Sequence, residues 1–130
     1  MKRMRLLGVF ALMLLLVSCN DYGEKVSEGK AEVYYKDGAT KDDAQRLMDY
    51  LFDIGYFDKD QESSVQITKS GKSYIVKLVT KPEYIKKEEL YPEYQNLRMS
   101  MSIKVFDNAP TELHLCDDQL KTKKKFTEEK

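Results

Sequence analysis

Two residues late in the chain have side chains that bind metals, at a spacing that brings them together. His114 and Cys116 lie two apart in the segment TELHLC, in which apolar and other residues alternate as in a β-strand. Side chains two apart in a strand point to the same face of the sheet. Imidazole and thiolate bind zinc and copper well, so this pair is one half of a candidate metal site.

A complete metal site needs more ligands than this pair supplies. Structural zinc usually takes four protein ligands, and the chain has one histidine and two cysteines. Asp117 or Asp118 would have to complete the set. We therefore favour the other interpretation, in which His114 and Cys116 are a partly covered pair on an edge strand. We expect no metal and no cofactor.

Other catalytic patterns are missing from the sequence. A single histidine excludes HExxH and all multi-histidine metal sites, and there is no CxxC, no GxSxG and no glycine-rich phosphate loop. The acidic pairs Asp42–Asp43 and Glu88–Glu89 are adjacent in sequence, so on a helix they would not face each other as an acid–base couple. We therefore expect that the protein is not an enzyme.

The other cysteine, Cys19, ends an apolar segment at the start of the chain. The sequence begins MKRMR, and an apolar run extends from Leu6 to Val17. A basic start and a short apolar stretch indicate a secretory signal peptide. The run is shorter than the about 20 apolar residues that a membrane span needs. Its end, Leu16-Val17-Ser18-Cys19, resembles the lipobox of bacterial lipoproteins.

This resemblance implies a lipid anchor on Cys19. In bacterial lipoproteins the cysteine thiol is diacylglycerated, a dedicated peptidase cuts before it, and in many bacteria the new amine is acylated, with palmitate an expected acyl group. Each buried methylene contributes about 0.8 kcal/mol and one chain binds only weakly, so stable anchoring takes two or more. The implied location is the cell envelope, and the residues after Cys19 do not distinguish inner membrane, outer membrane and cell surface.

Charge and cysteine count narrow the function of the exported part. Residues 1–18 carry three basic and no acidic side chains, so the remaining 112 residues have 19 Lys and Arg against 22 Asp and Glu, a formal charge of −3. This balance argues against nucleic acid as a partner. With Cys19 lipidated, Cys116 is the one remaining thiol, and no internal disulfide can form.

The chain divides into four parts by composition. We expect a signal peptide over 1–18, a lipid-anchored tether over 19–30, a domain over 31–120 and a flexible charged tail over 121–130. The tether is polar and reaches at most about 40 Å when extended. The lysine run 123–125 is most simply part of a solvated tail, and attraction to anionic lipid headgroups is the alternative.

The domain shows alternating helical and strand periodicities. Thr40 is a predicted N-cap with Asp43 in a capping-box position, and Gly55 is a predicted helix end. The segment 83–91 is predicted as a helical turn or a loop. Strands are predicted over 31–36, 64–69, 73–80 and 111–116, and helices over 41–54 and 92–106.

The resulting order is β-α-β-β-α-β, which is typical of an α+β ferredoxin-like sandwich. Right-handed crossovers then predict a four-stranded antiparallel sheet of order 4-1-3-2 with two helices on one face. The segments VYYKDGATKDDAQRL, IGYFD and ELHLCDDQLK also resemble uncharacterised small domains attached to bacterial membrane proteins.

One face of the predicted sheet is the candidate binding surface. Its predicted members are Tyr34, Ile75, Val79, His114 and Cys116. Exposed apolar patches mark interaction sites more often than catalytic ones, so we expect a non-catalytic protein-interaction module with a partner in the envelope. Small-ligand or metal binding on the same face is the alternative function. The face could instead be covered by the tail or the tether, or the faces of strand 73–80 could be reversed.

Overall fold

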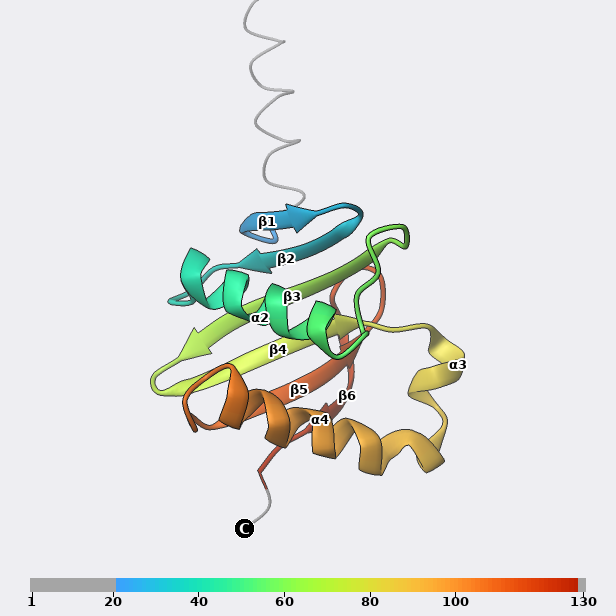
Figure 1. Cartoon of the computed structure of the whole chain (residues 1–130). Coiled ribbons are helices and arrows are strands. Elements are labelled where there is room, and N and C mark those ends of the chain that lie inside the picture. The colour runs from blue at the N-terminus through green and yellow to red at the C-terminus, as the bar shows by residue number, and fades with distance from the viewer. Residues whose placement is uncertain (1–20, 129–130) are drawn as a thin grey trace, which may run out of the picture.

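Six strands form one mixed sheet in which each strand pairs with the next one along the chain (Figure 1). The computed structural model describes residues 21–128. The predicted signal peptide and Cys19 therefore lie outside the described residues. The strands are β1 (Glu24–Glu28), β2 (Ala31–Tyr35), β3 (Ser63–Ser70), β4 (Ser73–Val79), β5 (Thr111–Cys116) and β6 (Thr122–Phe126).

The sheet consists of three hairpins joined by two crossovers. The pairs β1–β2, β3–β4 and β5–β6 are antiparallel, whereas β2–β3 and β4–β5 are parallel. Parallel neighbours need a long connection, and helices provide it in both places. The first crossover is α2 (Lys41–Asp53), and the second contains α3 (Pro82–Ile85), the 3₁₀ turn η1 (Glu88–Leu90) and α4 (Tyr91–Lys104).

Helix α2 has the ends and the apolar side that the sequence predicts. Thr40 caps it by accepting the backbone N–H of Asp43 at 3.1 Å, while the Asp43 carboxylate accepts the backbone N–H of Thr40 at 3.0 Å. Gly55, with φ of +83°, follows the last turn in a left-handed conformation that other residues rarely adopt. These contacts confirm the predicted capping box and helix end.

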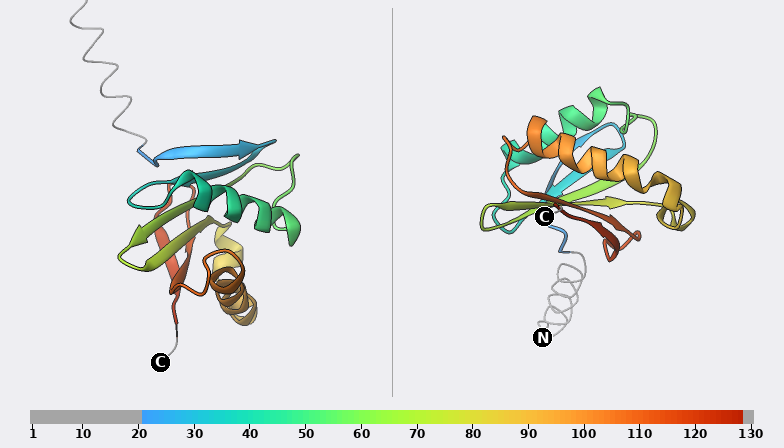
Figure 2. Two further views of the ribbon diagram at one scale, coloured as in Figure 1. Left: turned by 60° about the vertical axis from the view of Figure 1, so that its left-hand side comes forward. Right: turned by 90° about the horizontal axis from the view of Figure 1, so that it is seen from below.

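Both long helices lie on the same side of the sheet, α2 over β1 and β2 and α4 over β5 and β6 (Figure 2). The core lies between these helices and the sheet. Alternate strand residues supply one half of it, in accordance with the period of two. Its fully buried members include Leu47, Met48, Leu51, Val33, Val65, Ile67, Val76, Leu78, Met101, Leu113 and Leu115.

The predicted ferredoxin-like sheet is wrong, because the sheet is mixed and its strands lie in chain order. The element order β-α-β-β-α-β is present from β2 to β5, but each crossover joins adjacent strands and leaves no gap for another strand. A helix about 10 Å wide covers about two strands spaced about 4.8 Å apart. Helical periodicity therefore does not decide between an adjacent and a skipped strand.

The predicted tether and tail also prove to contain strands. β1 lies within 19–30 and β6 lies within 121–130, and these two strands form the edges of the sheet. Each is short and contributes one buried apolar side chain, Val26 from β1 and Phe126 from β6. Such segments have too few apolar residues for periodicity to identify them. The flexible charged tail is thus wrong at least as far as Phe126.

Phe126 tests whether β6 is an integral part of the domain. Its ring is 5% exposed, and its centroid lies 5.5 Å from that of Tyr91 and 5.7 Å from that of Tyr94. We expect Phe126→Ala to lower the free energy of unfolding by about 3 kcal/mol, as measured by urea denaturation. The exposed neighbour Lys125→Ala is the control and should change it by less than about 0.5 kcal/mol. Equal effects of the two variants would contradict an integral β6.

Candidate functional site

The face of the sheet opposite the helices, called here the open face, contains all five residues predicted for the binding surface. The strand register aligns Tyr34, Gln66, Lys77 and His114 in one row across four strands. Neighbouring rows contain Ile75, Val79 and Cys116, and the alternate residues Tyr74, Val76 and Leu78 point into the core. The strand faces are therefore assigned as the sequence predicted.

His114 and Cys116 are nevertheless buried rather than partly covered. Their exposed fractions are 5% and 0%, because β6 lies beside β5 and makes β5 an interior strand. His114 Nδ1 lies 2.9 Å from the Thr122 hydroxyl, and its Nε2 lies 2.9 Å from a Glu112 carboxylate oxygen. Both ring nitrogens thus have protein partners. The prediction of an edge-strand pair is wrong because the sequence did not reveal β6.

The surroundings of the Cys116 thiol and the His114 imidazole also favour the uncharged form of each group. Burial is the main cause that raises the pKa of the Cys116 thiol and lowers the pKa of the His114 imidazole. Within residues 21–128, no three His, Cys, Asp or Glu side chains are grouped so that they could hold a metal ion. The Asp117 carboxylate instead accepts the backbone N–H groups of Gln119 and Lys121, each at 2.9 Å.

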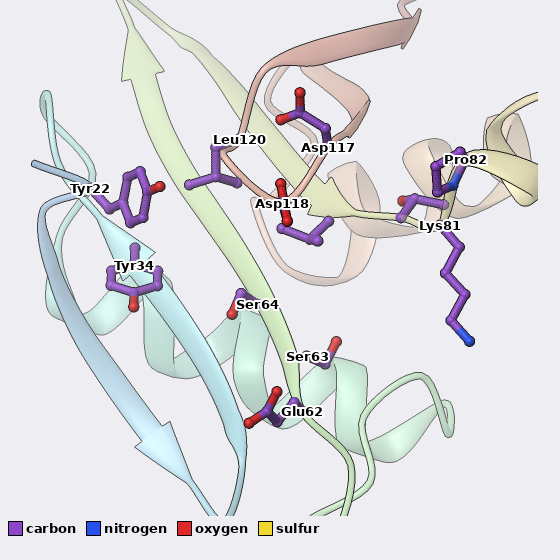
Figure 3. A pocket seen from close by; sticks show the side chains of 12 residues that line it. Tyr22, Tyr34, Glu62, Ser63, Ser64, Lys81, Pro82, Asp117, Asp118 and Leu120 are labelled. Carbon is purple, nitrogen blue, oxygen red and sulfur yellow. The ribbon is translucent and has the colours of Figure 1, made fainter. Parts of the chain in front are cut away.

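The side chains of Tyr22, which precedes β1, and Leu120, in the β5–β6 loop, lie over the middle of the open face. The backbone of each residue accepts a hydrogen bond from a side chain of that face. Gln66 donates its side-chain amide to the Tyr22 carbonyl oxygen at 3.0 Å, and Lys77 donates to the Leu120 carbonyl oxygen at 3.4 Å. Leu120 is 7% exposed, and its side chain points towards Tyr22 (Figure 3). The alternative that other segments cover this face is thus correct in part, through one tether residue and the β5–β6 loop.

Tyr22 and Leu120 were not predicted from the sequence, although a signal for them exists. Each is a lone large apolar residue in a polar segment, NDYGEK and DDQLKT. Isolated residues of this kind carry no periodicity. A turn-forming neighbour, Gly23 for the first and Asp117 for the second, is the local feature that indicates a chain bending back onto the sheet.

This cover divides the open face into two hollows, both lined by Tyr22 and Leu120. The first, called here the groove, has a volume of about 570 Å³ and lies where β4 and β5 end (Figure 3). It is lined by Tyr22, Tyr34, Glu62, Ser63, Ser64, Val79, Thr80, Lys81, Pro82, Asp117, Asp118 and Leu120. The second, called here the anchor-side hollow, has a volume of about 470 Å³ and contains Asp21, Lys36, Thr68, Ile75 and Lys77.

The groove combines apolar walls with an excess of acidic groups. Val79 and Tyr34 are half-buried, and the Tyr34 and Tyr22 rings meet edge to face with centroids 5.5 Å apart. Three carboxylates, those of Glu62, Asp117 and Asp118, line it together with one ammonium group, that of Lys81. Hydrogen bonds from backbone N–H groups lower the pKa of Asp117, and the bond from Lys121 makes the largest contribution. This carboxylate is therefore ionised at neutral pH.

The lowered pKa of His114 predicts how the free energy of unfolding depends on pH. Because burial lowers its pKa in the folded state, the unfolded chain binds a proton first as the pH falls below the ordinary histidine value of about 6.5. The imidazole contribution to stability is therefore present above that pH and lost below it. We expect the free energy of unfolding to fall less between pH 7.5 and 5.5 in His114→Gln than in the wild-type protein, as measured by urea denaturation. Parallel pH profiles for the two proteins would contradict this assignment.

The comparisons with known proteins place the domain in a family. No curated protein and no solved structure matches the chain. The model of the AF_1994_N family, described as a family N-terminal domain, matches residues 25–128. That match runs from β1 to the end of β6, so it includes all six strands of the sheet. It spans more than half of the 130 residues, and the chain therefore belongs to the AF_1994_N family.

Proposed function

We propose that the protein is a lipid-anchored lipoprotein of the cell envelope and that its domain is a non-catalytic protein-interaction module. The lipobox-like segment ending at Cys19 supports the anchor. In the part of the chain that the structure describes, no helix has the length and apolarity to cross a membrane. The acyl chains on Cys19 are the proposed attachment to the membrane, and the groove is the proposed binding site.

The groove is the observation on which the interaction role rests. A volume of about 570 Å³ with half-buried apolar walls lies within the range of protein binding pockets. Its walls come from β2, β3 and β4, which are spaced about 4.8 Å apart, so it extends about 10 Å across the sheet. An extended peptide covers this distance with about three residues. A short extended segment of a partner protein is thus the proposed occupant.

The charges of the groove indicate the chemistry of that segment. Asp117 is paired with Lys123 at 3.8 Å, so two carboxylates, those of Glu62 and Asp118, remain against the one ammonium group of Lys81. This remaining excess favours a partner segment with Lys or Arg side chains. The Ser64 hydroxyl donates to a Glu32 carboxylate oxygen and the Thr80 hydroxyl donates to the Leu78 carbonyl oxygen, so each can still accept a hydrogen bond from the backbone of the segment. Attachment of both proteins to one membrane raises their effective concentration, so a short and weak contact is sufficient for association.

The anchor is tested by replacing the proposed lipidation site. We expect the wild-type protein to incorporate labelled palmitate and to sediment with membranes, and Cys19→Ala to do neither. Ser18→Ala is the matched control, because it keeps a small residue before the cysteine and should leave both properties unchanged. Palmitate labelling that persists in Cys19→Ala would contradict the assigned site.

The groove is tested by in-cell crosslinking of the lipidated protein with a photoreactive residue at Val79. We expect one reproducible envelope protein to be captured from position 79 and not from Ile103, which is 58% exposed on α4, on the other side of the sheet. The charge reversal Asp118→Lys should reduce capture at least about tenfold, since a basic segment then meets a like charge. Asp49→Lys, an equal charge change on the exposed side of α2, is the control. Equal losses for both reversals, or equal capture from both positions, would refute the proposed binding site.

A further inference from the structure

The start of the described chain lies on the open face, well inside the edge of the sheet. The Asp21 carbonyl oxygen accepts a hydrogen bond from Lys36 Nζ at 2.9 Å, and the Tyr22 carbonyl oxygen accepts one from Gln66 at 3.0 Å. Gln66 belongs to β3, the third strand, and is 5% exposed. The view along the sheet shows this blue segment on the side opposite the helices (Figure 2).

A close backbone contact fixes this path. Gly23 has φ of +100°, and a Cβ at this position would lie 2.4 Å from the Tyr35 carbonyl oxygen. Only glycine meets both conditions without strain. The chain therefore turns sharply at Gly23, from Tyr22 on the open face to β1 at the edge of the sheet.

The distance from this point to the proposed lipid anchor is short. Cys19 and Asp21 are separated by two Cα–Cα steps, which span at most about 7.6 Å. A domain of about 110 residues has a radius of gyration of about 13 Å. The connection is thus too short to lead the anchor around the sheet to the side of the helices.

The anchor-side hollow also contains side chains that suit a lipid surface. The anchor-side hollow presents Tyr22 and half-buried Ile75, with the ammonium groups of Lys36 and Lys77 beside the carboxylates of Asp21 and Asp37. Tyrosine and lysine are the side chains that tolerate the boundary between water and lipid, because an apolar part ends in a polar group.

We propose that the open face lies against the headgroup layer of the membrane that holds the acyl chains of Cys19, with α2 and α4 turned away from it. This inference rests on the lipidation proposed above. It gives the anchor-side hollow a partner, the lipid surface, and it holds the groove at the level of the headgroups. A partner segment in the groove then lies along the membrane surface.

The test compares one position on each side of the sheet in the lipidated protein. In a Cys116→Ala background, Thr68→Cys in the anchor-side hollow and Ile103→Cys on α4 each receive a bimane label. The proteins are reconstituted into vesicles of phosphatidylcholine and phosphatidylglycerol that contain lipids with a nitroxide on the headgroup. We expect bimane at residue 68 to be quenched at least about twofold more than at residue 103. Equal quenching, or stronger quenching at 103, would overturn the proposal.

A second variant isolates the role of chain length. Insertion of about 20 Gly and Ser residues between Asn20 and Asp21 should reduce the quenching at residue 68 to the level at residue 103, since such a linker spans about 25 Å. An excess that survives the insertion would overturn the role given to the short connection. Vesicle flotation separates the two proposals: a protein that does not float refutes the anchor, whereas a floating protein without differential quenching refutes only the orientation.

Discussion

The helices cover one face of the sheet only, and this constraint shapes the rest of the molecule. The covered face can be fully apolar, whereas the open face must satisfy its polar groups and still limit its contact with water. Gln66 illustrates the solution, because it lies in the middle of the open face, is 5% exposed, and donates its side-chain amide to the Tyr22 carbonyl oxygen. Leu120 supplies apolar cover from the other direction. Its backbone has φ of +63°, a conformation that costs about 1 kcal/mol for a residue with a Cβ. Burial of a leucine side chain contributes about 2 kcal/mol, so the cover offsets the strain.

The two edge strands of the sheet also contain few apolar residues. β1 and β6 pair with one neighbour each, and a strand with a free edge is a template for unwanted pairing. Exposed lysines at 123 and 125 in β6, and Glu24 and Lys25 in β1, are the charged side chains that discourage it. The only cysteine among residues 21–128 is free and buried, so no disulfide strengthens this described part. Two five-residue strands with one buried apolar side chain each therefore complete the domain by packing alone.

Local structure could be predicted from the sequence where several residues repeat one signal. The apolar side of α2 and its capping box are of this kind, and so is β4, with Tyr74, Val76 and Leu78 in alternation. The order of the strands could not be predicted, because a crossover helix fits over an adjacent or a skipped strand equally well. β6 was missed because TKKKF offers charge where a strand signal needs alternation. That single omission also misplaced His114 and Cys116, which are interior groups once β6 covers the edge. Met99 and Ile103 on α4 are apolar, yet they are 46% and 58% exposed.

The groove and the attachment of the domain share a residue, which connects the two proposed roles physically. Tyr22 forms one wall of the groove, and it belongs to the segment that leads to Cys19. Its position is set by Gln66, which binds its carbonyl oxygen, and by the turn at Gly23, which brings the chain back to β1. A change in the path of this segment would move the wall of the groove, whereas the core lies on the other side of the sheet. The same few residues thus set how wide the groove is and, under the proposed lipidation, where the domain stands relative to the anchor.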